Sequence, residues 1–508
     1  MKRTKQLLSL LLALVFLGLS LSACASKSES SIENDGGMAP AEKEAFTDAS
    51  ASATATDGTI LRENPFVSVA NAPVSTFSAD VDTASYALFR RLVNAGYRLS
   101  DLKDFAAEAP FRTEEMFNYF DYNYAAPAAG EVFGTTASIT RAPWNDGTYL
   151  LTLGLATETP AERTANNLVF LIDVSGSMAS ADKLPLLKNA FACLVSSLGE
   201  NDTVSIVTYS GKEEVVLRGC KGSQPEKILN AIQALTASGS TNGESGLQKA
   251  YEIAAEQFVE GGNNRIVMAS DGDLNVGISS PEELKNYIAE KRDAGIYLSV
   301  LGFGTGNYRD DTMSALAQNG NGVYYYIDSA REAEKVLGTD LVATLYTVAK
   351  DVKFQITFDP AYVTEYRLIG YENRMLKTED FDDDTKDAGE VGAGHTLTVC
   401  YELKLSGNAL TDGGKTADWM KLAMRYKLPE SNDSTLKELV LGGSLLTDAP
   451  TDDARFLAAV IQTAMIVNGS SYNEKNVSLA AVLDTLSTLD LAGDGDKSEF
   501  KNLIETLV

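Results

Sequence analysis

Histidine is almost absent from this chain of 508 residues, which contains only His395. A zinc site built from several histidines is therefore excluded, and a Ser-His-Asp triad is possible only with His395. Cysteine is also scarce, since Cys24, Cys193, Cys220 and Cys400 are the four present. That number is too small for a disulfide-dense scaffold at this length, and the sequence assigns no pairing among them.

Positive charge is the next scarcity. Lys and Arg total 43 against 70 Asp and Glu, which gives a formal net charge of −27. A field of this sign repels nucleic acid and anionic lipid head groups and attracts cations. We therefore expect no nucleic-acid partner. At 508 residues the chain is also too long for one hydrophobic core, and two to four domains are expected.

The first 23 residues have the pattern of a secretory signal. Three basic residues lie among the first five, and residues 7–19 are nearly all apolar. This run is too short to span a membrane comfortably as a helix. It ends in Leu-Ser-Ala-Cys, which resembles a bacterial lipobox and implies cleavage before Cys24 and lipidation of Cys24. We therefore expect export and anchoring on the outer face of the bacterial cytoplasmic membrane, with the outer membrane as the open alternative.

Residues 24–62 are rich in Ser, Ala, Glu, Asp and Gly and have almost no large apolar side chains. A segment of this composition cannot bury enough apolar surface to offset its chain entropy. We expect a disordered tether that holds the folded part of the chain away from the lipid surface.

Residues 168–172 are an unbroken apolar run, typical of a strand buried on both faces. Asp173, Ser175, Gly176 and Ser177 follow directly. We expect Gly176 to allow a tight turn, so that the three oxygen-bearing side chains point into one space. A carboxylate and two hydroxyls suit Mg²⁺, Mn²⁺ or Ca²⁺ and are wrong for Zn²⁺ or copper.

The Asp-x-Ser-x-Ser pattern resembles the metal-ion-dependent adhesion site of von Willebrand factor A domains. That signature also needs a Thr in a later loop and an Asp after another buried strand, and Thr241 and Asp271 have these positions. The resemblance implies that Asp173, Ser175, Ser177, Thr241 and Asp271 bind Mg²⁺, or else Mn²⁺ or Ca²⁺. It also implies capture of an Asp or Glu carboxylate from a partner protein. The structural alternative is that these residues only cap helices or form turns.

Residues 166–345 alternate between strand and helix patterns, which predicts an α/β fold with a doubly wound, mostly parallel sheet. Ligands of such sheets bind beyond the carboxyl ends of the strands. Asp173 and Asp271 each follow a predicted strand, so one shared site is expected. The predicted strands are 168–172, 203–209, 214–217, 265–269, 296–303 and 322–327, and the predicted helices are 183–198, 225–235, 244–258, 281–294 and 310–318.

Further segments flank this domain. Residues 63–130, with Asn-Pro-Phe at 64–66 and aromatic residues at 116–124, form an N-terminal accessory region. Residues 131–165 hold two strands joined by an Asp-Gly hairpin signal at 146–147, which we expect to share a sheet with the C-terminal part. Residues 346–445 form a β-rich domain and residues 446–508 a helical region. These segments resemble those that accompany the A domain in a family of bacterial exported proteins.

Two classes of function stay open. The first is a membrane-anchored, metal-dependent protein-binding module without catalytic residues. The second is an exported metal-dependent hydrolase or phosphatase that uses the Asp173 site or Asp80 and Asp82, which resemble the start of a haloacid-dehalogenase motif. The strand expected before Asp80 is poor, and the simpler interpretation is that Asp82 or Ser85 caps a helix. Loss of partner capture in EDTA would indicate binding, whereas metal-stimulated hydrolysis would indicate an enzyme.

Overall fold

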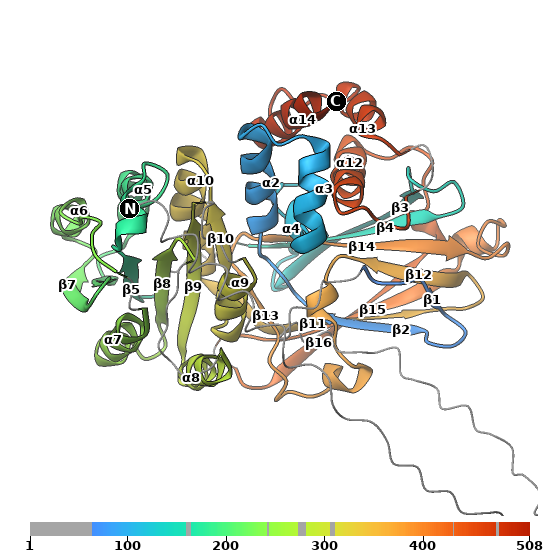
Figure 1. Ribbon diagram of the computed structural model, residues 1–508. Coiled ribbons are helices and arrows are strands. Elements are labelled where there is room, and N and C mark those ends of the chain that lie inside the picture. Colours follow the sequence, from blue (N-terminus) through green and yellow to red (C-terminus); the bar gives the residue numbers. More distant parts are fainter. Residues whose placement is uncertain are drawn as a thin grey trace, which may run out of the picture. The chain divides into compact units, whose positions relative to one another are not determined.

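The computed structural model describes residues 63–508 except 159–163, 241–242, 273–280, 305–309, 430 and 474–476. All of them fall in one compact unit, Ser52–Val508. The predicted signal, the tether and Cys24 lie outside the described residues. Three β-sheets and the helices around them make up the fold (Figure 1). No helix in the described part of the chain has the length and apolar character needed to cross a membrane.

One sheet is parallel except at its edge, as the alternating pattern predicts. Strand β5 lies in its middle, paired in parallel with β6 and β8, and only β7 runs antiparallel. All eight residues of β5 are buried, which explains the unbroken apolar run at 168–172 within it. The predicted α/β fold with a doubly wound sheet is thus confirmed. In sheet order the strands are β10 (Tyr324–Ile327), β9 (Ile296–Phe303), β8 (Asn263–Ser270), β5 (Asn166–Asp173), β6 (Thr203–Tyr209) and β7 (Glu213–Lys221).

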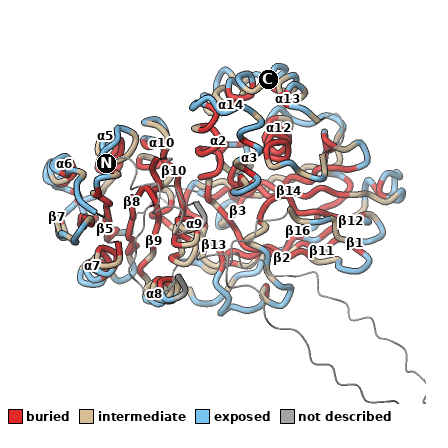
Figure 2. The backbone as a smooth tube through the Cα atoms, in the orientation of Figure 1, coloured by how far each residue is buried: buried red, intermediate tan, exposed pale blue. Residues whose placement is uncertain are grey.

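Helices cover both faces of this sheet. Phe170 of β5 belongs to the core on one face, where its ring meets that of Phe191 with the centroids 4.7 Å apart. Leu171 belongs to the core on the opposite face. Figure 2 shows the strands buried between these layers. One face is covered by α5 (Leu184–Ser197), α6 (Pro225–Gln233), α10 (Ala330–Lys335) and α11 (Leu341–Thr344), and the other by α7 (Gly243–Glu256), α8 (Pro281–Asp293) and α9 (Asp310–Asn319).

The other two sheets combine strands from both ends of the chain. Strand β4 pairs with β14, which confirms that the predicted hairpin shares a sheet with the C-terminal part. The first of these sheets has the order β1 (Val67–Ser68), β12 (Val363–Ile369), β14 (Thr396–Leu405), β4 (Tyr149–Thr157), β3 (Phe133–Arg141). The second contains β13 (Gly389–Gly392), β11 (Thr347–Phe358), β15 (Asp418–Lys427) and β16 (Ser434–Gly442), with β2 (Val74–Ser78) paired to β11.

Helices from the two ends of the chain also pack together. The ring of Phe120 lies 4.9 Å from that of Phe456 and 5.6 Å from that of Phe500, centroid to centroid. The aromatic residues of the N-terminal region are therefore core residues. The helices are α2 (Ala84–Asn94), α3 (Leu99–Glu108), α4 (Thr113–Phe117), α12 (Asp452–Val467), α13 (Leu479–Ser487) and α14 (Gly495–Leu507).

The predicted cap of α2 is wrong. The N-cap residue is Thr83, and its side chain makes no capping hydrogen bond. Asp82 instead accepts a hydrogen bond from the backbone N–H of Tyr324, and the Ser85 hydroxyl donates to Glu115. Both side chains thus bind residues distant in sequence and do not cap the start of α2. Among the cysteines of the described residues, Cys193, Cys220 and Cys400 are free thiols.

Candidate functional site

Two acidic residues meet at one edge of the parallel sheet. Asp173 is the last residue of β5, and Asp271 directly follows β8. The two strands are parallel neighbours, with Ile172 opposite Ala269. Both carboxylates therefore leave the sheet at its carboxyl edge, and both side chains are buried. The structure thus brings together two of the predicted site residues from segments almost one hundred residues apart.

The loop after β5 places the two serines beside Asp173. The backbone N–H of Ser175 donates to Oδ1 of Asp173 over 2.8 Å, and the hydroxyls of Ser175 and Ser177 lie 3.0 Å apart. Gly176 starts a single 3-10 turn, η1 (Gly176–Ala179), at an ordinary φ, so the expected conformational role of this glycine is not needed.

Thr241 lies outside the described residues, but the chain just before it reaches this loop. The N–H of Gly176 donates to the carbonyl of Gly239 over 3.0 Å, and the N–H of Ser238 donates to the carbonyl of Val174 over 2.7 Å. Gly239 has a φ of +86°, which favours glycine. Two backbone hydrogen bonds thus tie the segment leading to Thr241 against the Asp-x-Ser-x-Ser loop.

A residue that the sequence did not single out completes the cluster. Nζ of Lys183, at the start of α5, lies 2.8 Å from Oδ2 of Asp271 and 3.0 Å from the carbonyl oxygen of Ser177. The lysine side chain is 12% exposed and that of Asp271 is fully buried. One ammonium group therefore bridges the loops that follow β5 and β8.

The electrostatics of Asp173 suit a cation ligand. Burial raises its pKa to about 6, and the negative charge of Asp271 adds to the shift, while hydrogen bonds from Ser175 and the nearby Tyr209 side chain oppose it. Oδ2 of Asp173 is buried, and among the described residues no donor meets it in hydrogen-bond geometry, although the Tyr209 side chain is near enough to lower the pKa. A buried, unpaired carboxylate oxygen is costly unless something compensates its charge. Two carboxylates and two hydroxyls, without nitrogen or sulfur, fit a hard divalent cation.

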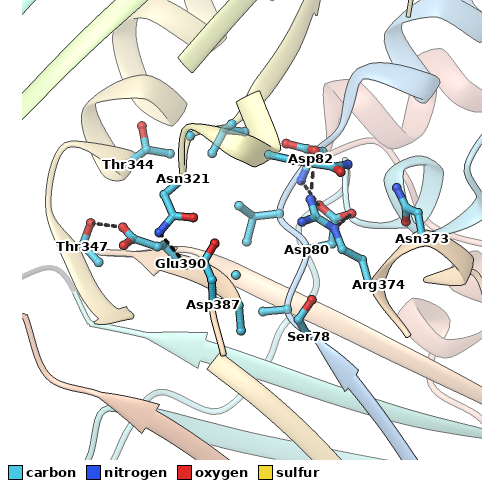
Figure 3. Close-up of a pocket in the computed structure, with 18 of the residues that line it drawn as sticks. Ser78, Asp80, Asp82, Asn321, Thr344, Thr347, Asn373, Arg374, Asp387 and Glu390 are labelled. Carbon is cyan, nitrogen blue, oxygen red and sulfur yellow. Dashed lines mark hydrogen bonds and ion pairs between the residues drawn. The ribbon is translucent and has the colours of Figure 1, made fainter. Parts of the chain in front are cut away.

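The alternative acidic pair lies elsewhere, and its charges are compensated within the protein. Nε and Nη2 of Arg374 lie 2.8 and 3.0 Å from the carboxylate of Asp80, and Nη2 lies 3.3 Å from Oδ2 of Asp82 (Figure 3). Burial, with the charge of Asp80 next, raises the pKa of Asp82. Asp80, Asp82 and Glu115 form one buried carboxylate cluster, and Glu115 accepts from Arg112 over 2.9 Å.

This carboxylate cluster borders a cavity of about 290 Å³. Figure 3 shows Asp80, Asp82 and Arg374 on one wall, with Asn321, Asp387 and Glu390 across from them. Arg374 follows the C-terminal strand β12, whereas Asp80 and Asp82 follow β2. The ion pairs of Arg374 with Asp80 and Asp82 therefore connect the N-terminal segment to the C-terminal part of the chain.

Family models match three successive segments of the chain. Residues 167–339 match the von Willebrand factor type A domain, and residues 56–152 match a second model described as von Willebrand factor. Residues 343–508 match the C-terminal domain of the protein YfbK. The "Uncharacterized protein YfbK" of Escherichia coli is 42% identical over 432 residues, which cover 81% of this chain and 74% of that protein. The chain belongs to the YfbK family.

Other similarities extend beyond the YfbK family. Human inter-alpha-trypsin inhibitor heavy chain H3 is 30% identical over 172 residues, which are 32% of this chain and only 19% of that protein. The solved von Willebrand factor type A structure from Catenulispora acidiphila has a TM-score of 0.42 at 15% identity, covering 76% of this chain and 88% of that one. VWA2 of Sulfolobus acidocaldarius, a paralog of ArnB, has a TM-score of 0.35 at 17% identity, covering 74% and 97%.

This YfbK-family chain therefore carries an A domain, residues 167–339, of a type that serves protein interaction and commonly binds a divalent metal. Within it the structure gathers Asp173, Ser175, Ser177 and Asp271 at one edge of the sheet. Sequence reasoning missed Lys183. Its only sequence signal is a basic residue a few positions after the loop, which by itself has no specificity.

Proposed function

We propose that this chain is an exported, lipid-anchored protein that binds a partner protein through a divalent cation. The cation, Mg²⁺ with Mn²⁺ or Ca²⁺ as alternatives, would be held by Asp173, Ser175, Ser177, Thr241 and Asp271. The observation that carries the proposal is the buried carboxylate of Asp173, whose Oδ2 meets no donor in hydrogen-bond geometry among the described residues and whose loop brings two serine hydroxyls within 3.0 Å of each other.

The donor set favours binding of an external carboxylate. Hydroxyl oxygens are neutral, so Asp173 and Asp271 supply all the negative charge of the proposed ligand set. Lys183 already uses part of the charge of Asp271. A divalent cation bound there would retain positive charge and an open position that accepts a carboxylate oxygen. An Asp or Glu side chain of the partner is the ligand of this chemistry.

The location is proposed from the N-terminal sequence. The basic start, the apolar run and the small residues before Cys24 support export and lipidation, and the polar tether up to residue 62 supplies reach. We place the folded unit on the outer face of the cytoplasmic membrane. A partner displayed elsewhere in the cell envelope would then be within reach of the A domain.

A pull-down from envelope extract tests the binding proposal. Purified protein should retain a partner in Mg²⁺, and should lose it in EDTA and with Asp173→Ala. Asp412→Ala is the matched control, because it removes the same charge from an exposed turn far along the chain and should leave capture unchanged. Equal capture by wild type with and without metal would refute the proposal.

The enzyme alternative makes a different prediction for the same samples. An exported hydrolase or phosphatase would turn over a generic substrate such as p-nitrophenyl phosphate, with stimulation by Mg²⁺. Under the binding proposal no turnover above the buffer rate is expected. If turnover occurs, Asp82→Asn and Asp173→Asn assign it to the carboxylate cluster near Arg374 or to the sheet-edge site.

A further inference from the structure

Lys183 is held in place from several sides. Its ammonium contacts the carboxylate of Asp271 and the carbonyl of Ser177, as described above. Its stem passes Gly304 at the end of β9, where an added Cβ would lie 2.2 Å from Cε of the lysine. Gly304 therefore leaves the space that the lysine stem fills. Contacts along its whole length thus fix the lysine side chain at this edge of the sheet.

In the part of the chain that the structure describes, the acid next to this lysine in sequence has other partners. The carboxylate of Asp182 accepts hydrogen bonds from Arg91 over 2.6 Å and from the Ser180 hydroxyl over 2.5 Å. The charge of Lys183 is therefore directed at Asp271, whose side chain is fully buried. A buried carboxylate requires a compensating charge. Lys183 provides it, in the place where the proposed function also requires Asp271 to face a divalent cation.

We propose that Lys183 is a tethered cation that competes with the divalent cation for Asp271. This inference rests on the proposed function and concerns how that site is regulated. Without bound metal, the ammonium holds the loops after β5 and β8 together. With metal bound, it lowers the affinity for the metal, because two cations then share the field of the same two carboxylates. The loops of the site are thus held together before the metal binds, and the affinity for the metal is lower as a result.

The same charge favours the partner. Asp173 and Asp271 carry two negative charges, and Lys183 carries one positive charge. Counted over these three described side chains, a site loaded with a divalent cation therefore has one net positive charge, whereas without Lys183 the same count gives zero. Attraction for an incoming carboxylate is stronger in the first case. Lys183 shifts the balance of the site from metal affinity toward partner affinity.

Metal titration of the full chain tests the inference. Lys183→Gln removes the charge and should bind Mn²⁺ about tenfold more tightly than wild type, measured by electron paramagnetic resonance of free Mn²⁺. Lys188→Gln is the matched control, since this lysine lies further along the same helix and donates to the carbonyl of Leu235 over 2.9 Å. Its Mn²⁺ affinity should equal that of wild type. Lys183→Met, which keeps the unbranched stem against Gly304, serves if the Gln variant folds poorly.

Thermal unfolding supplies a second readout that does not depend on a partner. In EDTA, Lys183→Gln should melt below wild type because buried Asp271 loses its counter-charge. Saturating Mg²⁺ should raise the melting temperature of the variant more than that of wild type.

Two outcomes distinguish failure of this inference from failure of the proposed function. If wild type binds Mn²⁺ and both Lys183 variants bind it equally or more weakly, Lys183 does not compete and the inference is overturned, while the metal site stands. If neither wild type nor the Lys183 variants bind Mn²⁺, the proposed function itself is overturned, and the inference with it.

Discussion

Arg90 of α2 occupies a buried ionic junction between three parts of the chain. Nε and Nη2 lie 2.8 and 2.6 Å from the carboxylate of Asp328, and Nη2 also lies 2.8 Å from Glu332. Nη1 contacts the hydroxyl of Tyr119 over 2.8 Å and the carboxylate of Glu499 over 3.2 Å. The side chains of Arg90, Asp328 and Glu332 are at most 3% exposed. A single guanidinium thus compensates two buried acids of the A domain and one acid of α14.

Arg90→Met should therefore be strongly destabilising. The substitution preserves apolar volume but leaves Asp328 and Glu332 buried without their shared cation. Removal of one partner from a buried ion pair costs about 3–5 kcal/mol of unfolding free energy, and we expect a loss in that range. Urea unfolding at neutral pH measures it. The only two tryptophans are both buried: Trp144 lies in the turn between β3 and β4, and Trp419 lies in β15, so fluorescence reports on the unit that Arg90 joins.

Lys421→Met is the control for this measurement. Lys421 and Glu438 form an ion pair at 2.8 Å, but their side chains are 49% and 47% exposed. Removing an exposed pair costs at most about 1 kcal/mol. If Arg90→Met also stayed within about 1 kcal/mol of wild type, the reasoning about uncompensated buried acids would be refuted. Adding Glu332→Gln to Arg90→Met should recover part of the loss, because it removes one of the orphaned charges.

Three further predictions concern buried acids. Burial, and then the charge of nearby Glu372, raise the pKa of Glu114, and neither of its carboxylate oxygens has a partner among the described residues. Its contribution to stability is present at acid pH and is lost as pH rises, so Glu114→Gln should gain stability over wild type with increasing pH in urea titrations. Glu115→Gln should destabilise at neutral pH, because Glu115 accepts from Ser85 and Arg112. Equal behaviour of the two variants would contradict this account. For Asp173, whose pKa is raised to about 6, Mn²⁺ affinity should be constant at higher pH and fall as pH drops below that value.

The central strands and their acidic ends were predictable because local sequence determines them. Strand β5 is an apolar run that stops at Asp173, and β8 is one that leads to Asp271. Parallel strands bring their carboxyl ends to one edge whatever the loops do. The hairpin of β3 and β4 was predictable for a similar reason, since Asp-Gly lies between two strand patterns.

The ion pairs were not predictable, because they join segments distant in sequence. Asp80 and Asp82 meet Arg374 almost three hundred residues later, so a helix cap was the best local interpretation of Asp82. Lys183 contacts Asp271, 88 residues later in the sequence, because the fold places the start of α5 next to the end of β8. The strand predicted at 214–217 is longer in the structure, because β7 extends to Lys221 past register shifts in its pairing with β6. Local sequence patterns predict individual helices and strands, whereas predicting the contacts between them requires knowledge of how they are arranged in the fold.

The pairing of β4 with β14 has a consequence for the order of events during synthesis. Strand β4 is buried along all nine residues, yet its partner β14 is translated only after the whole A domain. The A domain is contiguous and can fold as soon as it leaves the ribosome, whereas the flanking sheets must wait for the last third of the chain. Until then β4 presents an open apolar edge. A chain truncated before β14 should thus keep a folded A domain and aggregate through its hairpin.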